Sequence, residues 1–272
     1  MTMILLKDIP LISNQRLRED IFQLKLFSPE IVKLAQPGNF VFIRVSPTNS
    51  PLLRRAFSIY SIDSRINTFD LLFKAVGPGT LILSQKKFKD RIDILGPLGN
   101  NFSYPKPKEK VILVAGGMGI APLFFLASFL IQNKKLDPKK IDFLYGEKSQ
   151  KDFICLDDLK GLRVNLFLAT EDGFSGFKGL VTELFLRKRK NSFKSRDTII
   201  YSCGPQKMME KMAEISKRYD LSCQLSLESH MPCGIGACMG CVVKYGDKAY
   251  KRICSDGPVF DAQEVRFDRF TG

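Results

Sequence analysis

Short apolar runs separated by turn residues fill the first hundred positions of this 272-residue chain. The runs are rich in Phe, Ile, Val and Leu, and Pro, Gly, Asn and Asp stand between them, which is typical of β-strands joined by turns. The five runs cover residues 20–28, 39–46, 56–63, 68–76 and 90–99. Several strands at this spacing predict a small antiparallel β-barrel over residues 1–103.

The pattern changes after the Pro- and Lys-containing stretch 104–110, because residues 108–220 alternate between strands and helices. Strand-length runs cover 111–115, 141–146, 164–170 and 197–204, and helical patterns cover 121–133, 181–189 and 205–220. This alternation predicts a parallel sheet flanked by helices. The remaining residues, 221–272, are rich in cysteine and predict a small third domain, so the fold class is multidomain, β and then α/β.

The segment 111–131 carries no charge over roughly the length of a membrane span. Gly116, Gly117, Gly119 and Pro122 lie near its middle, where they would break a single helix. We therefore expect a buried strand, a glycine turn and a buried helix, and no membrane span.

Composition is that of a globular protein, with 44% hydrophobic and 26% charged residues. The net charge is +14, but the basic residues are scattered and the run 187–190 has no interleaved aromatic residues, so we expect no nucleic-acid partner. The chain has seven cysteines and does not open on a secretory leader, which predicts a reducing, cytoplasmic location.

Four of the cysteines have the spacing of a metal centre. Cys233, Cys238 and Cys241 follow the pattern C-x4-C-x2-C, and twelve residues separate Cys241 from Cys254. This is the ligand pattern of plant-type [2Fe–2S] clusters. The residues between them are small, so the backbone can wrap closely around a cluster and direct its N–H groups at the sulfurs. These small residues are Gly234, Gly236, Ala237 and Gly240.

Two other interpretations of these cysteines remain. A structural zinc site usually joins two close pairs of ligands, whereas three of the four ligands here share one loop. Free core thiols are the second alternative. The other cysteines, Cys155, Cys203 and Cys223, are interpreted as small buried hydrophobic residues.

Two segments of the predicted barrel have the chemistry of a flavin site. Arg55, Phe57 and Ser58 form the pattern R-x-F-S on a strand, where an arginine suits a pyrophosphate and a serine can hydrogen-bond a flavin ring. Farther along, Gly79 and Thr80 can offer backbone N–H groups to a phosphate at a helix start.

Two strand ends of the α/β region suit a nicotinamide cofactor. Gly116, Gly117 and Gly119 follow a strand and open a helix, although they do not form the G-x-G-x-x-G fingerprint. Cys203, Gly204 and Pro205 end another strand, and ligands usually bind at the strand ends of parallel sheets. A tight turn without a ligand is the alternative.

The order of these motifs resembles a known family. RAFS, GPGT, GPLGNNF, GGMGIAP and CGP are followed by CGIGACMGC and CSDGPVF, as in the electron-transfer subunits of bacterial dihydroorotate dehydrogenase B, within the ferredoxin–NADP reductase superfamily. The resemblance covers nearly the whole chain. It implies an FAD barrel over 1–103, an NAD-binding domain over 108–220 and a [2Fe–2S] domain over 221–272.

The resemblance also implies roles for individual residues. It implies cluster ligation by Cys233, Cys238, Cys241 and Cys254. It implies FAD contacts by Arg55, Ala56, Phe57, Ser58, Leu72, Phe73, Lys74, Gly79 and Thr80. Two positions depart from the family pattern, since Ala56 stands where proline is usual and Met118 varies the glycine turn.

The function implied is electron transfer from the FMN of a dihydroorotate dehydrogenase catalytic subunit, through the cluster and FAD, to NAD⁺. A flavin is needed because a cluster carries one electron and nicotinamide takes two. The dihydroorotate site is expected on the partner chain, in a complex with two copies of each subunit. No side chain of this chain is expected to act as an acid, base or nucleophile.

Two rival functions remain open. One is the flavin subunit of an NAD(P)H–ferredoxin oxidoreductase or hydrogenase-type complex, and the other is a zinc-stabilised adaptor without redox chemistry. Glu171 and Asp172 follow a strand where a ribose would lie, which favours NAD over NADP, but a plain polar loop explains them equally well.

Overall fold

The computed structural model describes residues 3–192 and 197–267. Its first part is a closed antiparallel barrel with the strand order β1-β2-β5-β4-β3-β6. The strands are β1 (Ile4–Arg18), β2 (Ile21–Phe27), β3 (Phe40–Arg44), β4 (Arg55–Asp63), β5 (Thr68–Lys74) and β6 (Arg91–Leu98). The predicted barrel is therefore confirmed, and each of the five apolar runs is one of its strands.

Strand β1 and the helix Pro29–Leu34 were not expected from the sequence, whereas a helix start at Gly79 and Thr80 was predicted. β1 is the longest strand, but its exposed polar positions and two register shifts against β2 break the simple apolar pattern. The helices α1 (Pro29–Leu34) and α2 (Pro78–Ser84) are short and each begins with proline, whose fixed φ suits the first helical position.

The second part is a seven-stranded sheet with the order β10-β9-β8-β7-β11-β12-β15. All neighbouring strands are parallel except β12 and β15. Its strands are β7 (Lys110–Gly116), β8 (Ile141–Glu147), β9 (Asn165–Thr170), β10 (Phe177–Lys178), β11 (Thr198–Cys203), β12 (Ser222–Ser226) and β15 (Val259–Asp261). The predicted parallel sheet is present, and it continues past residue 220 because β12 and β15 join its edge.

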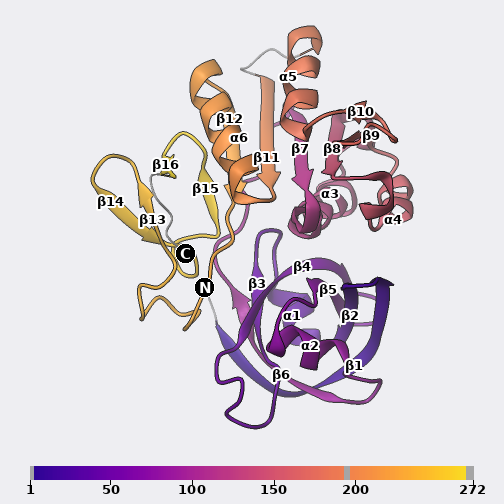
Figure 1. The fold of residues 1–272 in the computed structure, drawn as a ribbon, viewed down its shortest axis with the longest axis vertical. Coiled ribbons are helices and arrows are strands. Elements are labelled where there is room, and N and C mark those ends of the chain that lie inside the picture. Colours follow the sequence, from indigo (N-terminus) through magenta and orange to yellow (C-terminus); the bar gives the residue numbers. More distant parts are fainter. Residues whose placement is uncertain (1–2, 193–196, 268–272) are drawn as a thin grey trace.

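Helices cover both faces of this sheet (Figure 1). α3 (Ile120–Gln132) packs with Val111 and Leu113 on one face, and α5 (Val181–Ser192) and α6 (Gln206–Tyr219) pack with Ile112 on the other. Strand β7 is thus buried on both sides, which is why its sequence is continuously apolar. The other helical segments are α4 (Leu156–Gly161) and the 3₁₀ turns η1 (Gly117–Gly119), η2 (Pro138–Lys140) and η3 (Gln150–Asp152).

The uncharged segment 111–131 folds as the sequence predicted, as β7, the turn η1 and helix α3. Among the described residues, no helix has both the length and the apolar character needed to cross a membrane.

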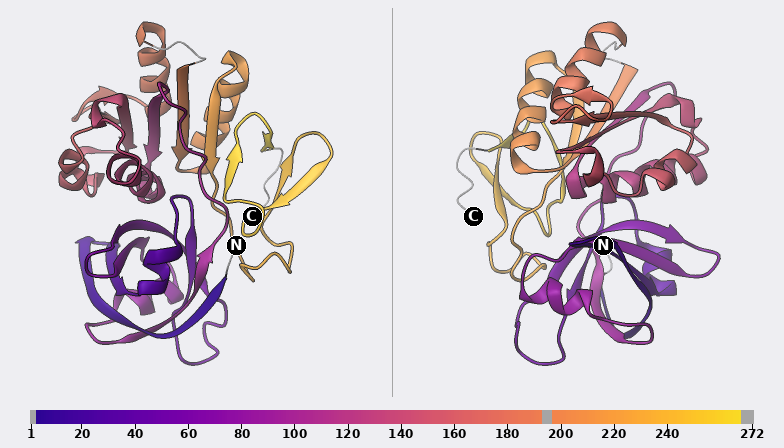
Figure 2. Two further views of the ribbon diagram at one scale, coloured as in Figure 1. Left: turned by 180° about the vertical axis from the view of Figure 1, so that it is seen from behind. Right: turned by 45° about the vertical axis from the view of Figure 1, so that its right-hand side comes forward.

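The third part is a small sheet of β14 (Ala249–Arg252), β13 (Val242–Tyr245) and β16 (Val265–Arg266) beside the other two parts (Figures 1 and 2). Helix α3 lies between the large sheet and the barrel, where the rings of Phe124 and Tyr60 stack with centroids 4.5 Å apart. The three parts therefore meet around one central region, and the candidate cofactor residues lie on its borders.

Candidate cofactor sites

The four cysteines of the C-terminal region lie together as two pairs. The thiols of Cys233 and Cys238 lie next to each other, and so do those of Cys241 and Cys254. The β13–β14 hairpin brings the last pair together, because the N–H of Ile253 donates to the carbonyl of Cys241 at 2.9 Å. Three or more His, Cys, Asp or Glu side chains grouped so as to hold a metal ion are not found in the described part of the chain.

Backbone N–H groups point at all four sulfurs. The nearest is that of Gly236, which lies 3.2 Å from Sγ of Cys254. The others come from Cys238, Gly240 and Cys254 itself and reach the Sγ atoms of Cys233, Cys238 and Cys241, each at 3.4 Å. Such donors stabilise sulfur that carries negative charge.

The pKa of Cys233 shows the effect of this backbone cradle. Burial alone would raise it, but the N–H groups of Ile235, Ala237 and Cys238 outweigh burial and lower the pKa to about 6. In a [2Fe–2S] cluster four thiolates are shared between two irons. Two thiol pairs inside a cradle of N–H donors fit that requirement.

An arginine next to the fourth cysteine fixes the loop, and the sequence reasoning missed it. Arg252 forms a forked ion pair with Asp256, with Nε 3.1 Å from Oδ2 and Nη2 3.2 Å from Oδ1. Its Nη1 also donates to the carbonyl of Gly236 at 3.0 Å. The Arg252 side chain therefore connects Asp256, on the far side of Cys254, to Gly236 in the first part of the cysteine loop. Only its proximity to Cys254 in the sequence hinted at this role.

The cysteine loop packs directly on the barrel. Gly234 has φ +71°, and a Cβ at this position would lie 2.9 Å from the ring of Phe42 on β3. Phe42 is the neighbour of Ala56 across the β3–β4 ladder. The loop that carries the cysteines therefore contacts the strand that precedes the RAFS segment in the barrel.

The RAFS and GPGT segments, far apart in the sequence, come together at one end of the barrel. A Cβ on Gly79 would lie 2.8 Å from Nε of Arg55, so the guanidinium lies against the backbone of α2. Thr80 holds this turn, since its Oγ1 accepts hydrogen bonds from the N–H groups of Val76 and Gly77 at 3.0 and 3.1 Å.

Several predicted flavin contacts have buried side chains. The rings of Phe57 and Phe73 pack in the barrel core with centroids 5.7 Å apart, and Leu72 is buried too. These residues can offer only their backbone to a cofactor. Lys74 is exposed and pairs with Asp20, with Nζ 3.1 Å from Oδ2.

The two strand ends predicted for nicotinamide also meet. A Cβ on Gly119 would collide with the carbonyl oxygen of Cys203, and one on Gly204 would lie 3.1 Å from the backbone of Gly116. Only glycines permit this approach of the β7 and β11 ends. Cys203 itself is buried, which raises the pKa of its thiol well above the ordinary value and keeps it protonated.

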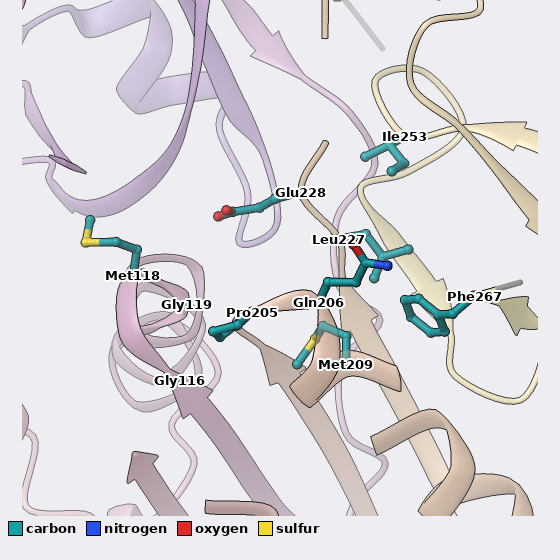
Figure 3. A pocket seen from close by; sticks show the side chains of 11 residues that line it. Gly116, Met118, Gly119, Pro205, Gln206, Met209, Leu227, Glu228, Ile253 and Phe267 are labelled. Atoms are coloured by element: carbon teal, nitrogen blue, oxygen red, sulfur yellow. The ribbon is translucent and has the colours of Figure 1, made fainter. Parts of the chain in front are cut away.

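A cavity of about 270 Å³ opens where these strand ends meet (Figure 3). Four predicted residues line it, whereas Gly117 and Cys203 do not. The lining residues are Gly116, Met118, Gly119, Gly204, Pro205, Gln206, Met209, Leu227, Glu228, Ile253 and Phe267.

Glu228 is the acidic residue of this cavity, and the sequence reasoning did not single it out. Its side chain is accessible from the cavity and is directed toward the side where Met118 lies (Figure 3). The surrounding protein nevertheless raises the pKa of its carboxyl group by desolvation. The sequence feature that could have indicated it is its position two residues beyond the end of β12, because ligands usually bind at the ends of parallel strands.

Glu171 and Asp172 lie in the exposed loop after β9. Asp172 Oδ1 accepts a hydrogen bond from the N–H of Phe174 at 3.1 Å, as a turn residue does. The preference for NAD over NADP stays a prediction.

Three family models match successive parts of the chain. An oxidoreductase FAD-binding domain matches residues 8–104, an oxidoreductase NAD-binding domain matches 113–214, and the iron–sulfur cluster binding domain of dihydroorotate dehydrogenase B matches 228–266. The chain is 38% identical to the dihydroorotate dehydrogenase B (NAD(+)) electron transfer subunit of Desulforamulus reducens, over 90% of this chain and 92% of the relative. The subunit of the same name from Caldanaerobacter subterraneus is 36% identical, over 94% and 96%.

The chain belongs to the family of dihydroorotate dehydrogenase B electron transfer subunits. It is an oxidoreductase subunit with FAD-binding, NAD-binding and iron–sulfur cluster binding domains, as the sequence predicted.

Solved structures agree with the fold of this family. An NADH-dependent reduced ferredoxin–NADP oxidoreductase superimposes with a TM-score of 0.83 and 29% identity, over 96% of this chain and 90% of that one. A ferredoxin reductase of carbazole 1,9a-dioxygenase has a TM-score of 0.67 and 17% identity, over 81% and 67%, and supports the fold alone.

Proposed function

We propose that this chain transfers electrons from the FMN of a dihydroorotate dehydrogenase catalytic subunit to NAD⁺, through its own [2Fe–2S] cluster and FAD, in pyrimidine biosynthesis. Its family membership and its three cofactor-binding domains support this function. The oxidation of dihydroorotate belongs to the partner chain.

The contact of the cysteine loop with the barrel carries the proposal. Gly234 lies against Phe42, and Phe42 is paired with Ala56 of the RAFS segment. A cluster in this loop would therefore be a near neighbour of a flavin held at that end of the barrel. Conversion of single electrons into a hydride is the chemistry that the bound flavin supplies.

The cluster would be held by Cys233, Cys238, Cys241 and Cys254. Their backbone donors lower the cost of negative charge on sulfur, and Arg252, paired with Asp256, holds the carbonyl of Gly236 in the loop.

The flavin would be held by the segment from Arg55 to Ser58, by the backbone of Leu72 to Lys74, and by Gly79 and Thr80. The arginine supplies a positive charge for the pyrophosphate, and the buried Phe57 and Phe73 fix the strands that carry the contacts.

The nicotinamide would enter the cavity between Gly116 and Gly119 on one side and Gly204 and Pro205 on the other. Gly117 would contact the dinucleotide from the turn η1, and Cys203 would support the cavity from beneath. The glycines carry no side chains, so a cofactor can approach their backbone closely.

The partner is a catalytic subunit that contains FMN, in a complex with two copies of each chain, and the location is the cytoplasm. The division into units of 1–103, 108–220 and 221–272 belongs to the same proposal, with β12 and β15 of the last unit extending the sheet of the second.

The deciding experiment mixes the purified chain, with its cofactors bound, with the FMN catalytic subunit, dihydroorotate and NAD⁺ in the absence of oxygen. We expect NADH to form only when both chains are present. A Cys238→Ser chain should abolish NADH formation. Reduction of artificial dyes without NADH formation by the complete mixture would overturn the proposal.

A second candidate function is that of a flavin and iron–sulfur subunit of an NAD(P)H–ferredoxin oxidoreductase. The likeness to the NADH-dependent reduced ferredoxin–NADP oxidoreductase, at 29% identity over nearly the whole chain, favours it as the alternative. This function predicts electron exchange between NADH and ferredoxin without the FMN subunit.

A further inference from the structure

The loop that follows β6 makes an unusually dense contact with the segment behind the fourth cysteine. The side-chain Nδ2 of Asn100 donates to the carbonyls of Asp256 and Val259 at 3.2 and 2.8 Å, and its Oδ1 accepts from the N–H of Val259 at 2.9 Å. The N–H of Asn100 also donates to the carbonyl of Gly257 at 2.6 Å. One residue of the barrel thus holds the backbone of 256–259 through four hydrogen bonds.

The same loop is fixed from the barrel side. Asn39 is buried at the start of β3, and its Nδ2 donates to the carbonyls of Gly99 and Asn100 at 3.0 and 3.1 Å. A Cβ on Gly99 would lie 2.8 Å from the carbonyl oxygen of Gly257, so the two backbones lie in contact. The connection therefore runs without a gap from β3 through Asn39 and Asn100 to the segment 256–259.

That segment is attached to the other cofactor regions as well. It begins two residues after Cys254, and Asp256 holds Arg252, which reaches the cysteine loop. At its other end, the carbonyl of Pro258 accepts from the N–H of Leu227, a residue of the nicotinamide cavity.

We infer that Asn100 is a positioning residue, which sets the distance between the cluster and the flavin by holding the segment 256–259 on the barrel. The inference rests on the proposed function. The contact of Gly234 with Phe42 packs the cysteine loop on the barrel, and Asn100 adds directional hydrogen bonds that fix the segment behind the fourth cysteine. Electron exchange between two sites falls steeply with their separation, and displacement of reacting groups by about 1 Å can lower a rate by about 100-fold.

The test uses the full chain with FAD and cluster bound, mixed rapidly with NADH without oxygen. NADH gives a hydride to the flavin, and one electron then passes from the reduced flavin to the oxidised cluster. In Asn100→Ala we expect hydride transfer to change less than about twofold and cluster reduction, normalised to iron content, to slow by about tenfold or more.

Hydrogen exchange supplies a readout that does not depend on turnover. The amide of Val259 should exchange faster in Asn100→Ala, because its acceptor is lost. Asn100→Asp keeps that acceptor but turns the donor into a carboxylate oxygen that faces the carbonyls of Asp256 and Val259. We therefore expect cluster reduction to slow at least as much as in Asn100→Ala, and Asn100→Asp replaces Asn100→Ala if that variant does not fold. The matched control is Asn101→Ala, because the side-chain Nδ2 of Asn101 donates to the carbonyl of its own neighbour Phe102 at 3.0 Å. This variant should leave both readouts unchanged.

Each outcome decides the inference. If the rate of cluster reduction is unchanged in both Asn100 variants while the Val259 amide of Asn100→Ala exchanges faster, Asn100 has only a structural role and the inference is wrong. The inference is also wrong if the exchange rate of the Val259 amide in Asn100→Ala is unchanged. Failure of the wild-type chain to bind iron or to accept a hydride would instead contradict the proposed function. The hydrogen-exchange data would still show whether Asn100 holds the segment 256–259.

Discussion

Arg18, at the end of β1 in the barrel, places its Nη1 2.7 Å from Oδ1 of Asp152 in the α/β part of the chain. The same nitrogen donates to the carbonyl of Asp152 at 3.2 Å, and Nη2 lies 3.2 Å from Oδ1 of Asp20. Both side chains of the Arg18–Asp152 pair are about three-quarters covered, with exposed fractions of 28% and 24%. This pair joins the flavin-binding and nicotinamide-binding domains.

Removal of this pair should weaken the attachment of the two domains. We expect Arg18→Ala and Asp152→Asn to show a coupling free energy of about 1 kcal/mol in a double-mutant cycle, because a half-buried pair is screened less than an exposed one. The free energy of unfolding in denaturant is the measurement. The control cycle is Lys211 with Glu214, whose side chains are 54% and 67% exposed and should couple by no more than about 0.5 kcal/mol. Equal coupling in both cycles would contradict the prediction.

Glu147, at the end of β8, should make stability depend on pH. Burial raises the pKa of its carboxyl group to about 7, and the charge of Asp152 adds to this, while the hydroxyl of Tyr145 and the charges of Arg18 and Lys74 oppose it. The folded state therefore binds a proton more tightly than the unfolded state, whose carboxyl titrates near 4.5. Stability should fall as the pH rises from about 4.5 to about 7, by on the order of 2 kcal/mol.

Glu147→Gln removes that titration, so its thermal midpoint should change less across the same pH range than that of the wild type. Asp157→Asn is the control, because the Asp157 side chain is 96% exposed. This variant should show the same change of thermal midpoint with pH as the wild type. If the thermal midpoints of the wild type and Glu147→Gln change with pH in the same way, Glu147 does not have this role.

Gly119 and Gly117 should respond differently to alanine. A Cβ on Gly119 would collide with the carbonyl of Cys203, whereas one on Gly117 meets no atom within 4 Å. Gly117 has φ +53°, so its change to alanine should cost only about 1 kcal/mol. We expect Gly119→Ala to lower the thermal midpoint more and to slow flavin reduction by NADH, since it forces the β7 and β11 ends apart. Equal effects of the two variants would show that the close approach is not required.

Glu228 should contribute to nicotinamide binding from its side of the cavity. Its carboxylate lines the cavity, and a hydrogen bond to a charged group contributes about 1.5–3 kcal/mol. We expect Glu228→Gln to raise the NADH concentration for half-maximal flavin reduction by about 10-fold or more. Glu214→Gln, on the exposed surface of α6, is the control. A wild-type response in Glu228→Gln would remove Glu228 from the site.

Loss of a single cysteine should remove the cluster and spare the flavin. Cys238 is exposed, so Cys238→Ser should fold normally and yet bind little iron, because serine is a poor ligand for such a cluster. The comparison is Cys223→Ala, a buried thiol outside the loop. Iron and labile sulfide counts, beside the flavin absorbance, are the measurement. A full iron content in Cys238→Ser would exclude Cys238 as a ligand.

Local patterns in the sequence predicted the elements whose identity depends on near neighbours. Examples are the barrel strands, the strand–turn–helix of 111–131 and the spacing of Cys233, Cys238 and Cys241. Each depends on a pattern of apolar, glycine or cysteine residues within a short stretch of the chain. β1 was missed because its register shifts and exposed positions obscure the periodicity. The addition of β12 and β15 to the sheet was missed because strand pairing at an edge is a long-range choice.

The sequence alone determined which cofactors the chain handles, since thiol spacing, glycine turns and the order of motifs are properties of the linear chain. Only the tertiary structure decided how those cofactor regions are joined. The bonds from Asn100 to Val259, from Arg252 to Gly236 and from Arg18 to Asp152 connect residues 159, 16 and 134 positions apart in the chain. The physical reason is that a hydrogen bond depends on the position of two groups in space to within a few tenths of an ångström, and no pattern along the chain specifies that position.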